Sequence, residues 1–460
     1  MAKDGFKMAD IINPSTLSGF MELLPGEQVI FDKMKAVLED TYKLYGFLPI
    51  DTPILEKSEI LLAKAGGETE KQIYRFSKGD TDLTMRFDLT VPLAKYVAKN
   101  YGDLTFPFKR YQIGKVYRGE RAQRGRFREF YQADIDIIGD GTLGIMNDAE
   151  IPSIIYTVFT RLGLDDFTIR INNRKILNGL FGLLGVTEYS ADILHIIDKL
   201  DKIGIEKVTA ELAELGIDAD TVEKILGLLC NNSDTATALG KLEAYLGQNE
   251  TFDLGYSELN DVVKYIGKFG VPERCFKIDL TIARGLDYYT GTVYETTFNK
   301  HPEIGSICSG GRYDNLAGFY TKNKLPGVGI SIGLTRLFYI LCEREYLNKS
   351  QSYPAEVLII PMTEDVSKAV EISAILRSEG IRTQIYPEKK KFKHMIGYAD
   401  KLSIPYAIFL GESEIETDTV SIKDMTTGEQ QNITLDEALS LLKASIADKG
   451  ESKCIVFDQN

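Results

Sequence analysis

Residues 109–139, KRYQIGKVYRGERAQRGRFREFYQADIDIIG, restrict the fold more than any other part of this chain. Two runs alternate polar with apolar side chains, which is the period of a β-strand, and they flank an arginine- and glycine-rich loop. Arg118 ends the first strand. One face of the second strand consists of Arg126, Arg128, Phe130, Gln132, Asp134 and Asp136. The sequence therefore predicts two strands, the second with a polar face that begins with cations and ends with acids.

This polar face has two interpretations. Arginines in a loop are often solvated and have no further role. An anion-binding end next to an acid-lined end, however, suits a zwitterionic amino acid that lies beside a polyphosphate, because guanidinium groups bind phosphate and carboxylate oxygens in pairs. Gln132 and Asp136 lie on the face that starts with Arg126, as such a ligand would require.

A third strand-like segment, GVGISIG at residues 327–333, has one face almost without side chains. That face consists of Gly327, Gly329, Ser331 and Gly333. A flat ring or another backbone can approach it closely, and Arg336 follows at the start of an apolar helix. The chain has neither a GxxxxGK[ST] loop nor a GxGxxG turn that opens a helix, so a nucleotide site must be built differently. A tightly packed glycine strand beside a surface arginine is the alternative.

TMRFDLTVPLAK, residues 84–95, places Asp88 and Thr90 just before a helix with Pro92 in its first turn. Either side chain can cap this helix, and on this segment alone capping is the better interpretation.

IARGLDYYTGTVYE, residues 282–295, begins with Arg284 and carries the adjacent Tyr288 and Tyr289. The segment is either a strand with a tyrosine pair in the core or a pocket wall with a cation aimed at an anion. Adjacent strand residues face opposite sides, so the sequence does not decide which phenol points inward.

The hydrophobic patterns divide the 460 residues into three blocks. Residues 1–350 mix helices with β-rich runs, interrupted at 186–262 by short helices that end near glycine or asparagine. Residues 355–446 alternate strands with helices, which predicts a small α/β domain with a mostly parallel sheet. Residues 447–460 form a C-terminal tail.

The net charge of −13 is distributed unevenly. Residues 186–262 hold sixteen acids against five lysines, whereas residues 109–128 hold eight lysines and arginines against one acid, Glu120. A second basic cluster is KKKFK at 389–393. These two basic regions are candidates for binding phosphates, although KKKFK alone is equally well a solvated face.

The five cysteines lack CxxC pairs and the three histidines lack metal-ligand spacing, so we expect no metal site and no disulfide framework. The N-terminus has no apolar signal core, and no window approaches the roughly 18 apolar residues of a membrane span. These features favour a cytoplasmic protein without a membrane partner.

Taken together, these segments resemble the signature motifs of class II aminoacyl-tRNA synthetases, and specifically of histidyl-tRNA synthetases. KVYRGERAQRGRFREFYQADIDIIG is similar to motif 2, GVGISIGLTR to motif 3, and RGLDYYTGTVYE and GSICSGGRYDNLAG (305–318) to the two histidine-specific signatures. KFKHMIGYADKLSIPYAIFLGESE resembles the anticodon-binding domain. The resemblance implies an α+β catalytic domain with an antiparallel sheet, a small helical insertion and a C-terminal α/β anticodon-binding domain.

The resemblance also implies a reaction. Histidine would attack the α-phosphate of ATP, which binds with Mg²⁺, and the histidyl group would pass from the adenylate to the terminal ribose of tRNA-His. Arg118 and Arg284 would be catalytic. Residues implied in ATP binding are Arg118, Glu120, Arg126 and Arg336. Residues implied in histidine binding are Asp88, Leu89, Thr90, Arg118, Gln132, Asp136, Arg284, Tyr288 and Tyr289. Residues implied in tRNA binding are Lys389, Lys390, Lys391 and Lys393.

A neutral imidazole offers one donor and one acceptor nitrogen, so a selective pocket needs an acid on one side and a hydroxyl on the other. Asp88 and a phenol of Tyr288 or Tyr289 would meet that need. The sequence departs from the common pattern at Ala122, where proline is frequent, and at Asp136, where glutamate is frequent.

The family implies a homodimer. The alternative is a catalytically silent paralogue that senses histidine and regulates histidine biosynthesis. Such paralogues usually lack the anticodon-binding domain and lose the arginines, whereas this chain keeps Arg118, Arg284 and Arg336.

Overall fold

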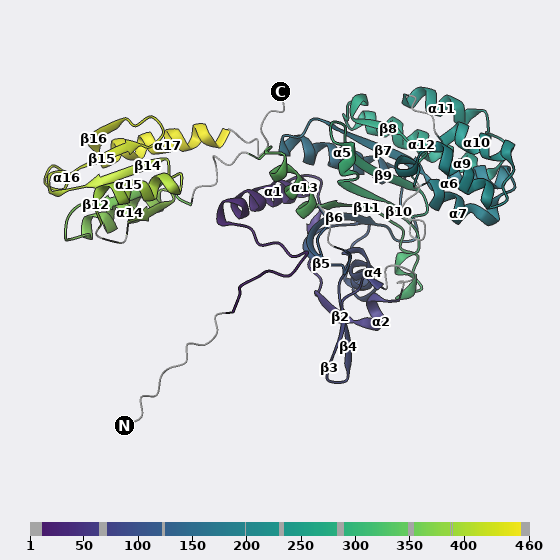
Figure 1. The fold of residues 1–460 in the computed structure, drawn as a ribbon, viewed down its shortest axis with the longest axis horizontal. Helices are drawn as coiled ribbons and strands as arrows, with labels where there is room; N and C mark the ends of the chain where they lie inside the picture. The colour runs from purple at the N-terminus through teal and green to yellow at the C-terminus, as the bar shows by residue number, and fades with distance from the viewer. Residues whose placement is uncertain are drawn as a thin grey trace. The chain divides into compact units, whose positions relative to one another are not determined.

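A computed structural model describes residues 12–63, 71–121, 125–197, 199–229, 234–282, 289–347, 354–386, 388 and 390–451, without the side chains of residues 201, 202 and 446–451. The chain divides into two compact units, one of Met1–Glu22 and Lys35–Glu345 and the other of Leu23–Met34 and Tyr346–Asn460 (Figure 1). Among the described helices, none combines the length and the hydropathy needed to cross a bilayer.

The first unit is built on a large mixed sheet. Its strands, in spatial order, are β1 (Leu48–Pro49), β5 (Phe108–Tyr117), β6 (Glu129–Ile138), β11 (Gly327–Gly333), β10 (Cys308–Tyr313), β9 (Thr292–Phe298), β7 (Phe167–Asn173) and β8 (Phe276–Ile278). The pairings from β5 to β7 are antiparallel, and β1–β5 and β7–β8 are parallel. The two strands expected within residues 109–139 are β5 and β6, and they pair directly with each other.

The two faces of this sheet differ in polarity because side chains alternate along each strand. The buried apolar face includes Ile135 and Ile330 and packs against helix α5 (Met146–Leu162), where the Tyr294 hydroxyl donates to the Asp148 carbonyl at 2.7 Å. The opposite face includes Asp134, which is almost fully buried. In Figure 1, α5 lies on one side of the strands and α4 (Thr90–Lys99) on the other.

The other described elements of this unit are α2 (Ser58–Leu61), η1 (Tyr101–Asp103), α6 (Arg174–Leu183), α12 (Glu250–Lys268), η3 (Glu273–Cys275), η4 (Pro302–Ile304), η5 (Leu316–Phe319), α13 (Leu334–Glu343) and a small antiparallel sheet of β2 (Leu55–Lys57), β4 (Thr81–Met85) and β3 (Arg75–Lys78). Helix α1 (Pro25–Leu44) has residues in both units. Helices α6 and α12 pack closely through glycine. A Cβ on Gly179 would lie 2.5 Å from the backbone nitrogen of Phe252, so no larger residue fits there.

The expected helical insertion contains η2 (Thr187–Tyr189), α7 (Ser190–Ile197), α8 (Leu200–Ile203), α9 (Ile205–Glu214), α10 (Ala219–Leu229) and α11 (Thr235–Glu243). Within residues 190–204, α7 and α8 are separate helices. The expected boundary at residue 262 falls inside α12, which packs against α5 and α6. The limits of the insertion therefore stay a prediction.

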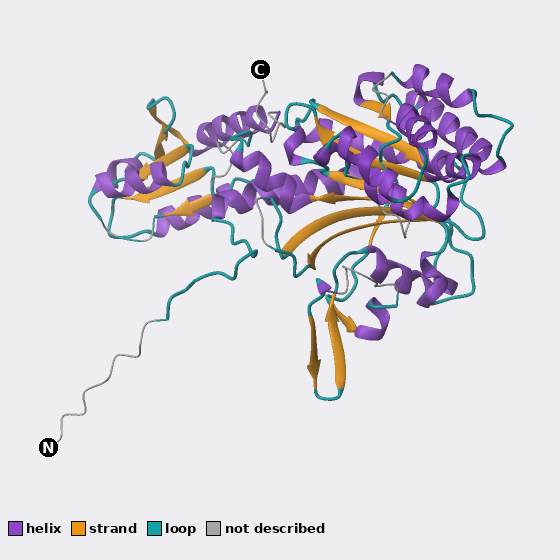
Figure 2. Cartoon of the chain, turned by 45° about the vertical axis from the view of Figure 1, so that its right-hand side comes forward, coloured by secondary structure: helices purple, strands orange, loops and turns teal. Residues whose placement is uncertain are grey.

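The second unit is a five-stranded sheet with helices on both faces (Figure 2). Its elements are β12 (Val357–Pro361), α14 (Ser367–Ser378), β13 (Thr383–Ile385), α15 (Phe392–Lys401), β14 (Tyr406–Leu410), α16 (Glu412–Glu416), β15 (Thr419–Asp424), β16 (Gln430–Thr434) and α17 (Leu435–Glu451). Alternate residues of β12 pack into two separate hydrophobic cores: Ile359 packs with Ile372 of α14, and Leu358 packs with Met395 of α15.

The prediction of a mostly parallel sheet in this unit is wrong in its second half. Strands β13, β12 and β14 are parallel, whereas β14, β15 and β16 pair antiparallel. The connection from β14 to β15 contains only the short helix α16, and a parallel crossover needs a dozen or more residues. The short connection therefore forces the chain to reverse.

Candidate active site

A cavity of about 330 Å³ opens on the polar face of the large sheet. Its walls come from the segment between β5 and β6, from β6, β10 and β11, and from the first turn of α13. Five residues predicted for ligand binding line it, namely Arg118, Glu120, Arg126, Gln132 and Arg336. The fold thus brings together side chains that are more than 200 positions apart in the sequence.

Two arginines in this cavity share one acid. Arg118 Nε donates to the Phe87 carbonyl at 2.9 Å, and the guanidinium carbon lies 5.2 Å from the centroid of the Phe130 ring. The Glu120 carboxylate lies 3.9 Å from Arg118 and 3.6 Å from Arg126. Two cations around a single carboxylate leave this wall positive, which favours an anionic ligand.

Arg336 belongs to the first turn of α13 and lines the cavity together with residues 306–309. Its guanidinium donates to the Ser306 carbonyl at 3.1 Å and also to the Ile304 carbonyl. These two carbonyls fix the cation beside the cavity, where it adds to the positive wall.

Asp136 is engaged on both carboxylate oxygens. Oδ1 accepts from the Tyr313 hydroxyl at 2.7 Å, and Oδ2 lies 2.5 Å from the Arg110 guanidinium. Arg110 is fully buried, stands opposite Asp136 on β5, and also donates to the Leu89 carbonyl at 3.3 Å. Burial raises the pKa of Asp136, and Arg110 and Tyr313 act against this rise by stabilising the ionised form. Asp136 therefore serves first as the partner of a buried cation.

Gln132 and Asp134 lie on the same face of β6, and their side chains are linked through Ser331 of β11. Gln132 Nε2 donates to Ser331 Oγ at 3.0 Å, and the Ser331 hydroxyl bonds to Asp134. Among the described residues, Gln132 Oε1 and Asp134 Oδ1 have no hydrogen-bond partner although both atoms are buried. Burial raises the pKa of Asp134 to about 7, with the Arg110 charge opposing the rise.

Asp88 and Thr90 lie at the start of α4. Asp88 Oδ1 accepts from the Val91 backbone N–H at 3.0 Å, so the capping role considered for Asp88 is observed. Burial raises the pKa of Asp88, and the nearby Arg118 charge lowers it. Leu89 is fully buried and its carbonyl receives the Arg110 hydrogen bond, so this backbone segment is tied to the sheet floor.

Tyr289 is the described member of the tyrosine pair. Its ring packs against Gly311 of β10, where a Cβ would lie 2.9 Å from the ring carbon Cδ1. Burial raises the pKa of the Tyr289 phenol, and the charges of Asp136, Asp134 and Asp88 raise it further. The phenol is therefore in the same electrostatic environment as the acids on the sheet face. Arg284, Tyr288 and Lys389 lie outside the described residues.

The three described lysines of the predicted tRNA-binding run belong to the second unit. Lys391 immediately precedes α15, Lys393 lies in its first turn, and both are exposed. Lys390 forms a surface ion pair of 2.6 Å with Glu388. A role of these lysines in binding tRNA stays a prediction.

Two residues of the polar sheet face were not anticipated from the sequence as site residues, Arg110 and Tyr313. The alternation in β5 places Arg110 on the same face as Gln112, so a signal for Arg110 was present. Tyr313 lies in the signature-like segment 305–318, but that segment gave no sign of its contact with Asp136, which spans 177 positions.

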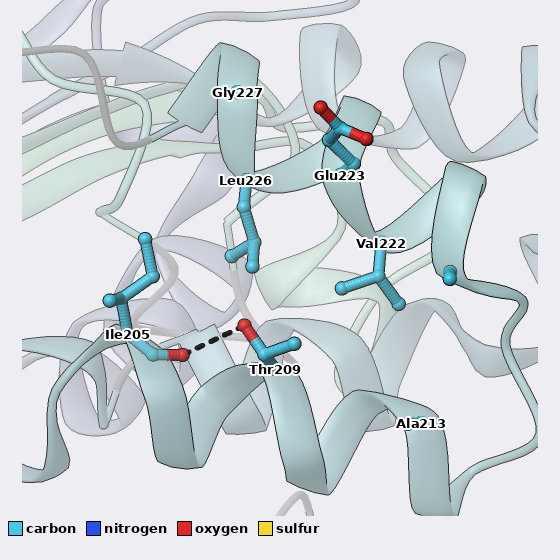
Figure 3. Close-up of a pocket in the computed structure, with 8 residues that line it drawn as sticks. Ile205, Thr209, Ala213, Val222, Glu223, Leu226 and Gly227 are labelled. Atoms are coloured by element: carbon cyan, nitrogen blue, oxygen red, sulfur yellow. Dashed lines mark hydrogen bonds between the residues drawn. The ribbon is translucent and has the colours of Figure 1, made fainter.

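A larger cavity, of about 580 Å³, lies between α9 and α10 in the helical insertion (Figure 3). In Figure 3, Leu226 and Val222 point from α10 toward α9, and the Thr209 hydroxyl turns back to the Ile205 carbonyl of its own helix at 2.9 Å. Its lining is mostly apolar, with Glu223 the charged residue. The smaller cavity on the sheet gathers several charged groups and is the better candidate for chemistry.

Comparison with known proteins gives one consistent result. Residues 19–337 match the family model described as histidyl-tRNA synthetase, and residues 356–445 match the model described as anticodon binding domain. The chain is 54% identical over 435 residues to the histidine–tRNA ligase of Clostridium tetani, covering 94% of this chain and 99% of that protein. It is 47% identical over 433 residues to the histidine–tRNA ligase of Finegoldia magna, covering 94% of this chain and 100% of that protein.

Among solved structures, the histidyl-tRNA synthetase of Nostoc sp. PCC 7120 superposes with a TM-score of 0.89 at 40% identity, covering 95% of this chain and 100% of that one. A Bacillus halodurans protein described as an ATP phosphoribosyltransferase regulatory subunit/histidyl-tRNA synthetase superposes with a TM-score of 0.71 at 21% identity, covering 84% of this chain and 97% of that one. At that identity the second likeness concerns the fold alone.

Proposed function

The chain belongs to the histidyl-tRNA synthetase family, and from that premise we propose that it is a histidine–tRNA ligase. It activates histidine with ATP to histidyl-adenylate and pyrophosphate, and then transfers histidine to the 3′-terminal ribose of tRNA-His. The geometric observation that carries this proposal is the cavity in which Arg118, Arg126 and Arg336 meet beside the buried acceptors of β6.

The activation step needs charge neutralisation more than covalent help. The histidine carboxylate attacks the α-phosphate and pyrophosphate leaves, so negative charge develops on phosphate oxygens. Arg118 is held by a carbonyl and an aromatic ring, and this fixed position suits it to bind the α-phosphate and the histidine carboxylate. Arg126 and Arg336 would bind the distal phosphates, and Glu120 would lie near the adenine. Arg284 is proposed to act with Arg118.

Recognition of the imidazole is assigned to Asp88 and to Tyr288 or Tyr289, at the entrance to α4 and on the segment before β9. An acid accepts from one ring nitrogen and a phenol serves the other. The shared electrostatic environment of Asp88 and Tyr289 supports this assignment. Leu89 and Thr90 would complete the wall, since Leu89 immediately precedes α4 and Thr90 is its first residue.

The silent paralogue that regulates histidine biosynthesis is not favoured. Identity of 54% to a histidine–tRNA ligase extends over 94% of the chain, and residues 356–445 match an anticodon-binding domain. A regulator of an enzyme would have no need for a domain that binds an anticodon.

We further propose that Mg²⁺ enters as part of the MgATP substrate, because Mg²⁺ is usually held largely by substrate phosphates and water. A homodimer and a cytoplasmic location follow the family pattern. Sedimentation of the purified protein would test the dimer.

The decisive experiment is ATP–pyrophosphate exchange with each amino acid in turn. We expect exchange with histidine and none with proline, threonine or glycine. Pure protein that shows no histidine-dependent exchange would refute the proposal.

The same assay tests the catalytic arginine. Arg284→His is expected to lower exchange by about 10²–10³-fold, the typical effect of removing one preorganised group at developing charge. An exchange rate near that of the unsubstituted protein would show that Arg284 is not a catalytic residue.

A further inference from the structure

We propose that Thr335 is a positioning residue for ATP, because its hydroxyl fixes the start of α13 on β6 and so determines where Arg336 lies beside Arg126. This inference rests on the proposed function, in which both arginines bind the distal phosphates of ATP. Thr335 immediately precedes Arg336 and is 3% exposed, so it acts through Arg336 and not by touching the nucleotide.

The hydroxyl takes over where the sheet ladder between β6 and β11 ends. The last pair of this ladder is Gln132 with Gly333, and α13 begins at Leu334. Tyr131 is the next residue of β6, beyond the end of the ladder. Its backbone N–H donates to Thr335 Oγ1 at 2.8 Å. The threonine hydroxyl therefore supplies an acceptor that β11 would provide if the strand continued, and it joins the helix to the sheet.

The start of α13 needs a directional contact of this kind. Gly333 precedes the helix and has no side chain with which to cap it. The apolar side of α13 is buried, with Leu337 fully buried and Phe338 1% exposed, but hydrophobic contact is not directional. A hydrogen bond, in contrast, requires a short distance and a nearly linear donor. The Thr335 hydroxyl is therefore the contact that specifies how the first turn is rotated against β6.

The turn fixed in this way carries Arg336 next to the segment that carries Arg126. A Cβ on Gly125 would lie 3.8 Å from Arg336 Cγ, so the stem of this arginine is adjacent to the residue before Arg126. One turn further along α13, the ring of Tyr339 meets that of Phe127 edge to face at 5.4 Å. The separation of the two cavity cations therefore depends on how α13 is held against β6.

The guanidinium of Arg336 is held by another part of the sheet. It donates to the Ser306 carbonyl at 3.1 Å and to the Ile304 carbonyl, both of which precede β10. A shift of the α13 backbone would therefore pull the guanidinium away from these carbonyls or move it relative to Arg126. Charge-assisted hydrogen bonds to phosphate oxygens are short and directional, so a polyphosphate requires its cations at a fixed spacing. A misplacement of about 1 Å can cost about 100-fold in rate.

The test compares ATP with AMP, which lacks the distal phosphates. Isothermal titration calorimetry would measure the binding of MgATP and of AMP to the full chain. Thr335→Val keeps the shape of the side chain but removes the acceptor. It is expected to weaken MgATP binding by about 10-fold, as for the loss of one hydrogen bond to a charged group, and to change AMP binding little. The ratio of the ATP affinity to the AMP affinity should therefore fall.

Rescue by serine identifies the hydroxyl as the cause. Thr335→Ser keeps the oxygen and loses only the methyl group, so its affinity ratio should stay near that of the unsubstituted protein. Thr335→Ala removes the oxygen with a smaller side chain and should give the same low ratio as Thr335→Val. A ratio as low in Thr335→Ser as in Thr335→Val would overturn the proposal, and so would a ratio that neither Thr335→Val nor Thr335→Ala changes.

A double substitution tests whether Thr335 acts through Arg336. Two residues that act as one unit have non-additive effects. In a protein that carries Arg336→Gln, the further change Thr335→Val should therefore leave the affinity ratio where Arg336→Gln alone puts it. Additive losses would overturn the proposal, because they would show that Thr335 influences ATP binding by another route.

The matched control is Thr383→Val in the second unit. The Thr383 hydroxyl is also buried and donates to the Ile381 carbonyl at 3.0 Å. Both valine variants lose one buried hydrogen bond and should have lower melting temperatures, whereas only Thr335→Val should lower the affinity ratio. Equal losses of MgATP and AMP binding in Thr335→Val would overturn the proposal, because they would indicate general damage to the site.

Exchange kinetics separate this inference from the function on which it rests. Absence of histidine-dependent exchange in the unsubstituted protein would refute the function. Where exchange is present, Thr335→Val should raise the KM for ATP by about 10-fold and leave the KM for histidine near its original value, because other residues are assigned to histidine. Exchange in which Thr335→Val leaves the KM for ATP unchanged would refute only the role of Thr335.

Discussion

Arg110 shows at the scale of one residue how this active site is built. Its side chain is fully buried and its guanidinium contacts the Asp136 carboxylate and the Leu89 carbonyl. Nε and one terminal nitrogen have no hydrogen-bond partner in the described part of the chain. A buried ion pair of this kind is weak evidence for stability, yet breaking it exposes the full cost of an unpaired charge. Arg110 thus holds Asp136 in place and links the sheet to the start of α4.

Arg110→Met should therefore destabilise the protein by about 3–5 kcal/mol, because it leaves Asp136 buried without its cation. Urea denaturation followed by circular dichroism would measure the change. The control is Arg75→Met, which removes an exposed partner of Asp82 in the β3–β4 hairpin and should cost at most about 1 kcal/mol. Equal effects of the two substitutions would contradict this account.

Asp134 gives the folded protein a defined pH dependence. Burial raises its pKa to about 7, so the folded chain holds the proton more tightly than the unfolded chain does. The resulting stability is present below the ordinary pKa of an aspartate and is lost as the pH rises through about 7.

Asparagine resembles the protonated acid, so Asp134→Asn should gain melting temperature relative to the unsubstituted protein as the pH rises from 5 to 8. Thermal melts of both ligand-free proteins at each pH would measure the difference. A difference that stays constant over this range, or reverses, would show that Asp134 does not titrate there.

At the scale of elements, β11 determines how closely the sheet face can be approached. Gly329 stands opposite Asp136, and a Cβ there would lie 2.3 Å from both the Ile135 carbonyl oxygen and Asp136 Oδ1. The interpretation of 327–333 as a tightly packed glycine strand is therefore correct at Gly329. Toward the other end of the strand, Ser331 and Gly333 line the cavity. The same strand therefore packs tightly against β6 at Gly329 and forms part of the site at Ser331 and Gly333.

Gly329→Ala should lower the free energy of unfolding by about 1–3 kcal/mol, as overpacking in a dense core does. The matched control is Gly267→Ala in α12, where a Cβ would meet nothing within 4 Å and alanine should stabilise the helix by about 0.5–1 kcal/mol. Chemical denaturation of both variants is the measurement. A neutral Gly329→Ala would mean that the strand can move aside.

At the scale of the whole molecule, acidic and basic residues are concentrated in different parts of the chain. The insertion carries a large excess of acids, whereas the cavity wall and the KKKFK run are basic. A chain of net charge −13 can therefore present local positive surfaces to phosphates. The family match of residues 356–445 makes the second unit the part expected to read the anticodon.

Replacing Lys390, Lys391 and Lys393 by glutamine should weaken tRNA binding. The slope of log K against log salt should fall by about 1 for each lysine–phosphate ion pair that the replacement removes. Histidine-dependent exchange should not change, since these lysines belong to the second unit. The control replaces three other lysines of that unit, Lys368, Lys401 and Lys443. An unchanged salt slope for the first variant would indicate that the KKKFK run is a solvated surface that does not contact phosphates.

Much of this architecture could be predicted because it depends on local patterns. The period of two in β5, β6 and β11 assigns each side chain to a face, and the alternation of strands and helices in 355–446 predicts an α/β unit. The prediction of parallel pairing is wrong at β15, because the direction in which two strands pair depends on the length of the connection between them as well as on the strands themselves. The roles of individual site residues stay predictions.

The sequence by itself determined that Gln132, Asp134 and Asp136 share one polar face, since alternation along a strand is a local property. Only the tertiary structure decided how the two acids differ. Arg110 comes from the neighbouring strand and Tyr313 from 177 residues away, and both contact Asp136. Asp134, two residues earlier, has an oxygen that no described residue contacts by a hydrogen bond. The physical reason is that a buried carboxylate needs a hydrogen-bond or ion-pair partner, and the tertiary fold determines which residue provides it.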